Sequence, residues 1–343
     1  MIAMESPRVP RTSRDDPAHG GIVSPAGNLG YGSDTARSGR TDDPFALARA
    51  RLAARINREQ SPRPDLPQLD ELIAEVAELQ PLPAVATKIL QLGDSQFSAH
   101  ELATLIASDQ VMTARLLRLA NSAYYGSSRK IGTVRDAVVL LGFRTVHQVA
   151  LASCLVGNPQ PLANIEYDEF WQFSIATGLL SEILARTEGH HQDEAFTAGV
   201  IHNIGLLTLD QNRPHVLTEV MTRARQQHET LHQAERGLLG YTDADLGGAL
   251  ALHWNFPESL AAAVQQHAGL DAPPPSDSLA AIVIRARIFA RSYGLSDGLR
   301  DRPDPLPEAG EITSGQFTSS LAREGGMDRI LERADAFIAA ALG

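Results

Sequence analysis

Histidines are the residues of this 343-residue chain with the clearest capacity for metal chemistry, and most of the eleven lie in its second half. A neutral imidazole is a good nitrogen ligand for divalent metals, and two histidines four residues apart can bind zinc from one face of a helix. His228 and His232 have this spacing. Because no third ligand follows at a matching helical position, we interpret this pair as part of a solvent-exposed face.

The remaining chemistry-bearing residues do not form a known enzyme signature. Cys154 is the single cysteine, which excludes an intrachain disulfide and a cysteine-rich zinc site. Its apolar neighbours favour a buried and unreactive thiol. The sequence has no Walker-type phosphate loop, no glycine-rich dinucleotide turn after a strand, and no Gly-x-Ser-x-Gly elbow. We therefore expect no cofactor.

The charge of the chain limits the kind of partner that it can bind. Its formal net charge of −11 argues against a general grip on nucleic acid, which requires an excess of Lys and Arg facing phosphates. The Arg-rich stretch at 49–58 leaves open a regulator linked to nucleic acid through this segment. The chain has no apolar run of signal-peptide type and no stretch near the roughly 20 apolar residues of a membrane span. We expect a cytoplasmic protein without membrane insertion.

The elements that must position any site are helices. From Leu69 to Tyr293 apolar residues recur at steps of three and four, and no alternating strand pattern competes with them. Ala and Leu are abundant and aromatic residues are few, which also favours helix. Capping residues stand at predicted helix starts, namely Ser98 with Glu101, Asp109, Thr133 with Asp136, and Thr242 with Asp245. We expect Gly199 and Gly205 to permit close helix packing. The predicted fold class is all-α.

Composition divides the chain into four parts. Residues 1–65 are rich in Gly, Ser, Pro, Asp and Arg, so we expect a disordered tail with a short helix at 44–59. Residues 66–157 form a first helical lobe, and a Pro- and Asn-containing stretch separates them from a second lobe at 158–293. Residues 294–343 form a polar segment and a terminal helix.

Five segments in order resemble the HDOD family, the HD-related output domain. The sequence LQPLP at Leu79–Pro83 is similar to the opening of the family, although Gln80 stands where proline is usual. The most specific segment is DQVMTARLLRLANSAYYG at Asp109–Gly126, followed by IGTVRDAVVLLG at 131–142. Then come AFTAGVIHNIG at 195–205, and Glu235 with WNFP at 254–257. The resemblance covers residues 66–292.

This resemblance implies an all-helical, two-lobed fold in which an N-terminal helical lobe packs on a degenerate HD-phosphohydrolase-like lobe. It further implies an output or scaffold role in bacterial signalling, in a family whose members generally have no established catalytic activity.

The resemblance also locates the positions where an HD hydrolase holds its metals. Such an enzyme uses His and Asp ligands so that a metal-bound water can attack phosphate near neutral pH. Aligned with that pattern, this chain retains His202 and His267, offers Asp243 as a ligand where histidine is usual, and has Asn203, Phe173 and Arg287 at the other positions. Asparagine lacks the charge, a phenyl ring cannot coordinate, and arginine adds a cation. We therefore expect a relic site with no bound metal and no catalytic residue, with a buried, hydrogen-bonded His202. The alternative is that His202 helps His267 and Asp243 to hold a metal or an anion. Glu235 is interpreted as a capping or structural acid.

A chain that has retained its core but not its metal ligands is interpreted as a binding module. The predicted function is non-catalytic signalling or regulation through a protein partner, such as a signalling protein, or a small ligand. Contacts are expected from Tyr124, Tyr125, Arg129 and Lys130, because aromatic residues and arginine are enriched in interfaces. A packed position between the lobes is the alternative for the two tyrosines. The alternative functions are a divergent metal-dependent phosphohydrolase acting on nucleotides or cyclic dinucleotides, and the nucleic-acid-linked regulator.

Overall fold

The computed structural model of this chain describes residues 68–79, 99–125, 130–155, 162–268, 274–301 and 314–342. Within these ranges the regular structure is α-helical, and β pairing is limited to an isolated bridge between Ile165 and Leu299. This confirms the predicted fold class. All of the described residues belong to one compact unit, Asp43–Gly343.

The first group of helices contains α4 (Ala99–Ala107), α5 (Gln110–Ala120), α6 (Val134–Leu141) and α7 (Phe143–Leu155), which pack against one another. Local signals set their ends. The Asp109 carboxylate accepts hydrogen bonds from the first turn of α5, and the Thr133 hydroxyl does the same for α6. Gly142 ends α6 at a φ of 80°, a conformation that glycine adopts without strain. The predicted caps at these two starts are confirmed.

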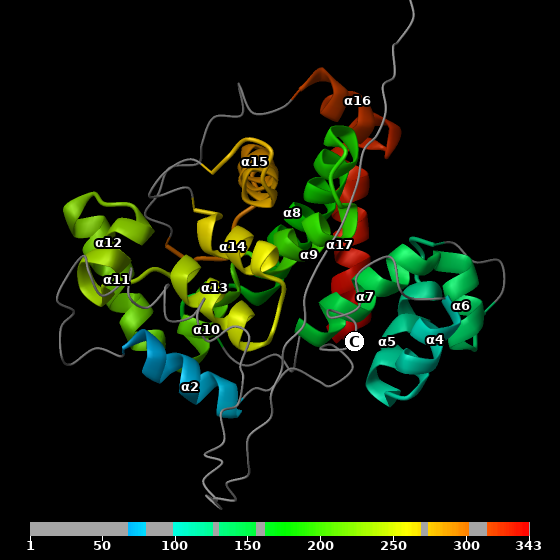
Figure 1. The fold of residues 1–343 in the computed structure, drawn as a ribbon, viewed down its shortest axis with the longest axis horizontal. Coiled ribbons are helices and arrows are strands. Elements are labelled where there is room, and N and C mark those ends of the chain that lie inside the picture. The colour runs from blue at the N-terminus through cyan, green and yellow to red at the C-terminus, as the bar shows by residue number, and fades with distance from the viewer. Residues whose placement is uncertain are drawn as a thin grey trace, which may run out of the picture. The chain divides into compact units, whose positions relative to one another are not determined.

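Helix α2 (Leu69–Leu79) does not belong to this first group. It packs on α13 (Asp243–His253), and Glu75 forms an ion pair with Arg213. Figure 1 shows α2 beside α10 and α13, away from α4–α6. A helix that precedes the first group in the sequence therefore lies against the second. The residue limits given above for the two lobes stay a prediction.

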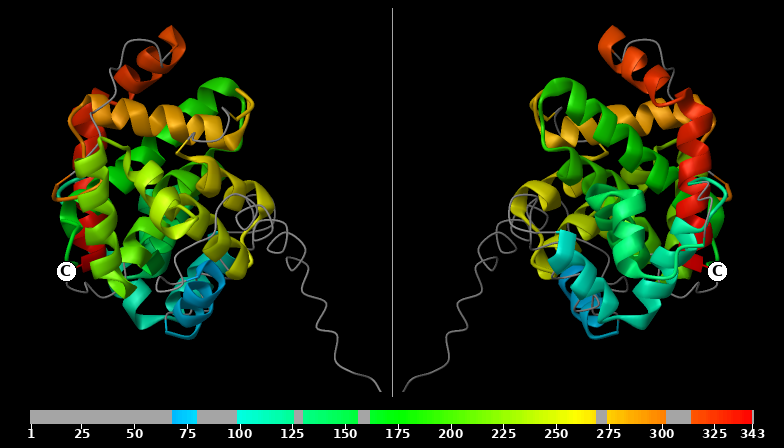
Figure 2. Two further views of the ribbon diagram at one scale, coloured as in Figure 1. Left: turned by 90° about the vertical axis from the view of Figure 1, so that its left-hand side faces the viewer. Right: turned by 90° about the vertical axis from the view of Figure 1, so that its right-hand side faces the viewer.

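The second group surrounds α8 (Tyr167–Glu188), which contacts α9 (Gln192–Ile201) and α15 (Leu279–Ser292). Figure 2 shows α15 lying across α8. Helix α8 is buried on nearly all sides from Phe170 to Ala185, and its apolar residues accordingly surround the helix instead of forming one stripe. The other helices of this group are α10 (Ile204–Asn212), α11 (Pro214–Gln227), α12 (Leu231–Leu239), α13 and α14 (Glu258–Gln266).

Two glycine contacts bring the helices of the second group unusually close. A Cβ atom on Gly199 would lie 2.6 Å from the Cα atom of Gly178, where α9 meets α8. A Cβ atom on Gly205 would lie 1.9 Å from the carbonyl oxygen of Asp243, where α10 meets α13. Both positions exclude any side chain, which confirms the packing role predicted for Gly199 and Gly205.

Helix α17 (Gly326–Leu342) connects the two groups, and α16 (Gly315–Arg323) packs against α8 and α17. α17 lies along α8 and also contacts α5 and α7 (Figure 1). The Arg118 guanidinium of α5 donates to the carbonyl of Ala340, and Arg333 donates to the Gln148 side chain of α7. The predicted terminal helix therefore contributes to the core.

No helix among the described residues is long and apolar enough to cross a membrane. The tail at 1–65 with its helix at 44–59, Arg129, the cap at Ser98 and the side chain of Cys154 lie outside what the structure describes.

Candidate functional site

The second group of helices brings the predicted relic positions together, three of them at helix ends and two within helices. His202 follows the last residue of α9, His267 follows α14, and Asp243 is the first residue of α13. Phe173 lies on α8 and Arg287 on α15. All five side chains are less than a tenth exposed.

His202 and His267 have the same local geometry. Nδ1 of His202 is 2.6 Å from the carbonyl oxygen of Gly199, and Nδ1 of His267 is 2.6 Å from that of Val264. Since a carbonyl only accepts, each Nδ1 carries the proton and donates it. Each Nε2 atom then carries a lone pair, and both of these buried atoms lack a hydrogen-bond partner. The two rings meet edge to face with centroids 5.2 Å apart.

Burial keeps both imidazoles neutral. It lowers the pKa of His202 well below 6.5, and the neighbouring His267 and the Arg287 guanidinium act in the same direction. Burial and then Arg287 lower the pKa of His267 to about 3. The site therefore holds two uncharged nitrogen donors whose rings are fixed by backbone hydrogen bonds.

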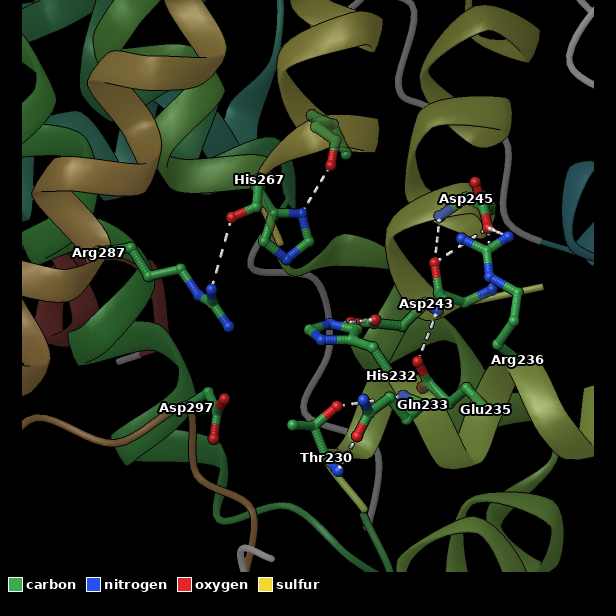
Figure 3. A network of polar contacts seen from close by, with 12 residues as sticks. Thr230, His232, Gln233, Glu235, Arg236, Asp243, Asp245, His267, Arg287 and Asp297 are labelled. Carbon is green, nitrogen blue, oxygen red and sulfur yellow. Dashed lines mark hydrogen bonds and ion pairs between the residues drawn. The ribbon is translucent and has the colours of Figure 1, made fainter. Parts of the chain in front are cut away.

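His232 joins this group, contrary to the sequence interpretation. It is buried, its Nε2 atom lies 2.9 Å from Oδ1 of Asp243, and its ring centroid is 6.1 Å from that of His267. Figure 3 shows the rings of His232 and His267 directed toward one another beside Asp243. Burial alone would raise the pKa of Asp243, but the neighbouring His232 holds that pKa below its usual range.

The prediction of one exposed face bearing His228 and His232 was wrong because a helix boundary separates the two residues. His228 ends α11 in the left-handed conformation and is exposed, whereas Thr230 begins α12. Thr230 and Gln233 form a capping box, a Thr-x-x-Gln signal that is visible in the sequence. That signal could have placed His232 in the first turn of a new helix, although not in the core.

Glu235 and Asp245 hold the beginning of α13. Oε2 of Glu235 accepts a hydrogen bond from the backbone N–H of Asp243 at 3.2 Å, as its interpretation as a structural acid requires. Burial, reinforced by the Asp243 carboxylate, raises the pKa of Glu235 well above its usual range. Asp245 forms the predicted capping box with Thr242, and Arg236 forms an ion pair with Asp245 at 3.0 Å (Figure 3).

The positions that lost a ligand carry groups that oppose metal binding. The Phe173 ring lies 5.4 Å from that of His202, with the Arg291 guanidinium 5.5 Å from its centroid. Arg287 donates to the carbonyl oxygen of His267 at 3.4 Å. Asn203 is buried at the start of α10 and provides no charge. The two-metal group of an HD hydrolase therefore does not fit, because the bridging carboxylate is absent and a cation lies beside the remaining donors.

Of the described residues predicted for partner contacts, the two tyrosines are packed against the protein and the lysine is exposed. The Arg329 guanidinium of α17 lies 4.0 Å from the centroid of the Tyr124 ring, so this tyrosine packs against the terminal helix. Tyr125 is half-buried against the core, and burial raises the pKa of its hydroxyl. Lys130 is exposed. The structure thus places both tyrosines in packed positions.

The sequence of residues 79–270 matches the model of the HDOD domain family, and the match covers more than half of the chain. With this fold and this set of positions, the chain belongs to the HDOD domain family.

Known proteins share this architecture. A crystal structure named "Putative phosphohydrolase" from Shewanella amazonensis SB2B is 28% identical, with a TM-score of 0.61 over 78% of this chain and 97% of that chain. A "Putative signal transduction protein" from Marinobacter aquaeolei VT8 is 24% identical, with a TM-score of 0.60 over 90% and 68% of the two chains. An uncharacterized protein of Treponema pallidum (strain Nichols) is 24% identical over 216 residues, which are 60% of this chain and 42% of that protein. This chain therefore matches less than half the length of that curated relative.

Proposed function

We propose that this chain is a non-catalytic regulatory module that binds a signalling protein or a small ligand. The observation that carries the proposal is the state of the HD-type positions. Phe173 and Arg287 stand among the remaining donors, and His202 and His267 are fully buried.

Hydrolysis of a phosphate ester needs a metal-bound water, and the substrate must reach it. Structures that support such chemistry hold at least one open coordination position. Here the donors face each other inside the helical core, and the guanidinium of Arg287 lies where the counter-charge of a metal would be needed. These features favour binding over turnover.

The signalling part of the proposal follows from the family and from the name of the Marinobacter structure. Among the described residues predicted for partner contacts, Lys130 is exposed, and partner contacts are assigned to it. The exposed apolar side chains Val111 on α5 and Val139 on α6 lie in the same group of helices and are further candidate contacts.

The alternative is a divergent metal-dependent phosphohydrolase, in line with the name of the Shewanella structure. Purified full-length chain should be incubated with mononucleotides or cyclic dinucleotides and with Mg²⁺, Mn²⁺, Fe²⁺ or Zn²⁺. We expect product release no faster than in protein-free controls and no difference between wild type and His202→Ala. Metal-dependent turnover that is lost in His202→Ala and kept in the exposed variant His228→Ala would overturn the proposal.

The binding part is tested by affinity capture with the intact chain from its own cells. We expect a retained signalling protein that His202→Ala also captures and that Lys130→Glu or Val139→Glu captures less. Equal recovery with all four baits would contradict the assigned surface.

A further inference from the structure

We infer that His232, Asp243 and His267 form a buried site for one zinc-class divalent ion. This site goes beyond the proposed function, because a regulatory module could act with or without it. It also differs from a two-metal hydrolase site: it needs no bridging carboxylate at position 203, and it uses His232, which lies on α12.

The geometry of three side chains carries the inference. One ligand atom each from His232, Asp243 and His267 lies within 4.8 Å of the other two, and all three side chains are buried. They come from three successive helices, α12, α13 and the end of α14. One ion at their centre would link these helices.

The fixed imidazoles are a second, independent observation. Histidines that bind metals commonly donate the other ring N–H to a backbone carbonyl, which fixes the tautomer and directs the free nitrogen at the metal. His267 and His202 both do this, through Val264 and Gly199. Their Nε2 atoms are buried and lack a hydrogen-bond partner, and their rings are 5.2 Å apart. Buried polar atoms without partners are rare in native structures and call for an explanation, for which a bound ion is one answer.

The types of donor select the class of metal. Imidazoles with one carboxylate suit zinc and neighbouring divalent transition metals, whereas Mg²⁺ and Ca²⁺ prefer sets of oxygen ligands. All three donor side chains are buried, so the ion would lie inside the helical core and away from bulk solvent. A site buried in this way is compatible with the absence of turnover proposed above.

Binding changes the existing pair of His232 and Asp243. In the metal-free chain these side chains meet at 2.9 Å through Nε2 and Oδ1. Coordination requires the His232 Nε2 lone pair, so the Nε2 proton leaves to solvent and both atoms turn to the ion. Arg287, which bonds to the backbone carbonyl of His267, remains nearby as a repulsive charge.

The test uses full-length chain stripped with a chelator and then titrated with Zn²⁺ or Co²⁺. We expect one equivalent of tightly bound metal and a Co²⁺ absorption spectrum typical of four-coordinate tetrahedral geometry. His232→Gln and Asp243→Asn should each lower affinity at least a hundredfold, and the matched control His228→Gln should bind like wild type.

The variant Arg287→Gln is expected to gain affinity, a result that loss of folding could not produce. Because it removes a cation and keeps a donor for the His267 carbonyl, it should bind Zn²⁺ at least tenfold more tightly. The inference is overturned if wild type binds no more than His232→Gln, if His228→Gln also loses the ion, or if Arg287→Gln leaves affinity unchanged. None of these outcomes affects the turnover assay, so the two proposals fail separately.

Discussion

At the scale of single residues, the site is defined by buried groups in unusual ionisation states. His202 and His267 are held neutral, and Asp243 is held as a carboxylate by His232. None of these states could be assigned without knowing what each side chain contacts. From these shifts we expect the metal-free protein to be sensitive to acid.

For His267 the pKa falls from 6.5 to about 3, so the native state binds fewer protons than the unfolded chain between these values. Stability from this residue is complete above about pH 6.5 and declines as the pH falls toward 3. The slope is about 1.4 kcal/mol per pH unit for each such histidine. Urea unfolding from pH 7.5 to 4, with a chelator present, should show this decline.

The matched variant is His267→Gln, whose side chain does not titrate and can still donate to the Val264 carbonyl. Its unfolding free energy should depend less steeply on pH over the same range, while the exposed control His228→Gln should follow wild type. Parallel curves for His267→Gln and wild type would contradict this prediction.

At the scale of elements, the site depends on the close approach of helix ends. The start of α10 meets the start of α13 at Gly205 and Asp243, and α9 meets α8 at Gly199 and Gly178. These contacts leave no room for a methyl group, so the spacing of the helices is fixed by the absence of side chains. The beginning of α13 is further held by Thr242, Asp245 and Glu235.

Gly205→Ala is therefore expected to destabilise the protein strongly. The added Cβ atom would lie 1.9 Å from the carbonyl oxygen of Asp243, which is backbone and cannot rotate away. A loss of about 3 kcal/mol or more in unfolding free energy is expected, at or above the usual range for overpacking. Gly315→Ala is the control, since it has open space at the start of α16. Equal stability of the two variants would show that α10 and α13 can separate freely.

At the scale of the whole described structure, the terminal helix α17 makes the two helical groups interdependent. It packs on α8 in one group and on α5 and α7 in the other. Phe337 of α17 is 2% exposed, and Arg333 beside it bonds to Gln148 of α7. Loss of this contact is therefore expected to lower the stability of both groups of helices.

Phe337→Ala should lower the unfolding free energy by about 3–5 kcal/mol, because it removes a buried ring and leaves a cavity. Trp171 and Trp254 lie in the second group, so tryptophan fluorescence reports that group, whereas far-ultraviolet circular dichroism reports all helices. We expect coincident transitions in wild type and an earlier dichroism transition in Phe337→Ala. Tyr293→Ala, an exposed aromatic position, should match wild type.

The sequence alone determined the helical class, several helix starts and the family. These depend on local physics: the Asp109, Thr133 and Thr242 caps act within one turn, and apolar spacing along a helix is a property of neighbouring residues. The resemblance also identified five of the residues that converge at the site, namely Phe173, His202, Asp243, His267 and Arg287.

Only the tertiary structure decided how those residues meet. It placed His232 in the core beside Asp243, packed Tyr124 under Arg329, and set α2 against α13. Each outcome depends on contacts between segments far apart in the chain, or on a helix boundary that reverses the direction of a side chain. Burial and ion pairing arise from such long-range packing, and no local pattern of residue types encodes them.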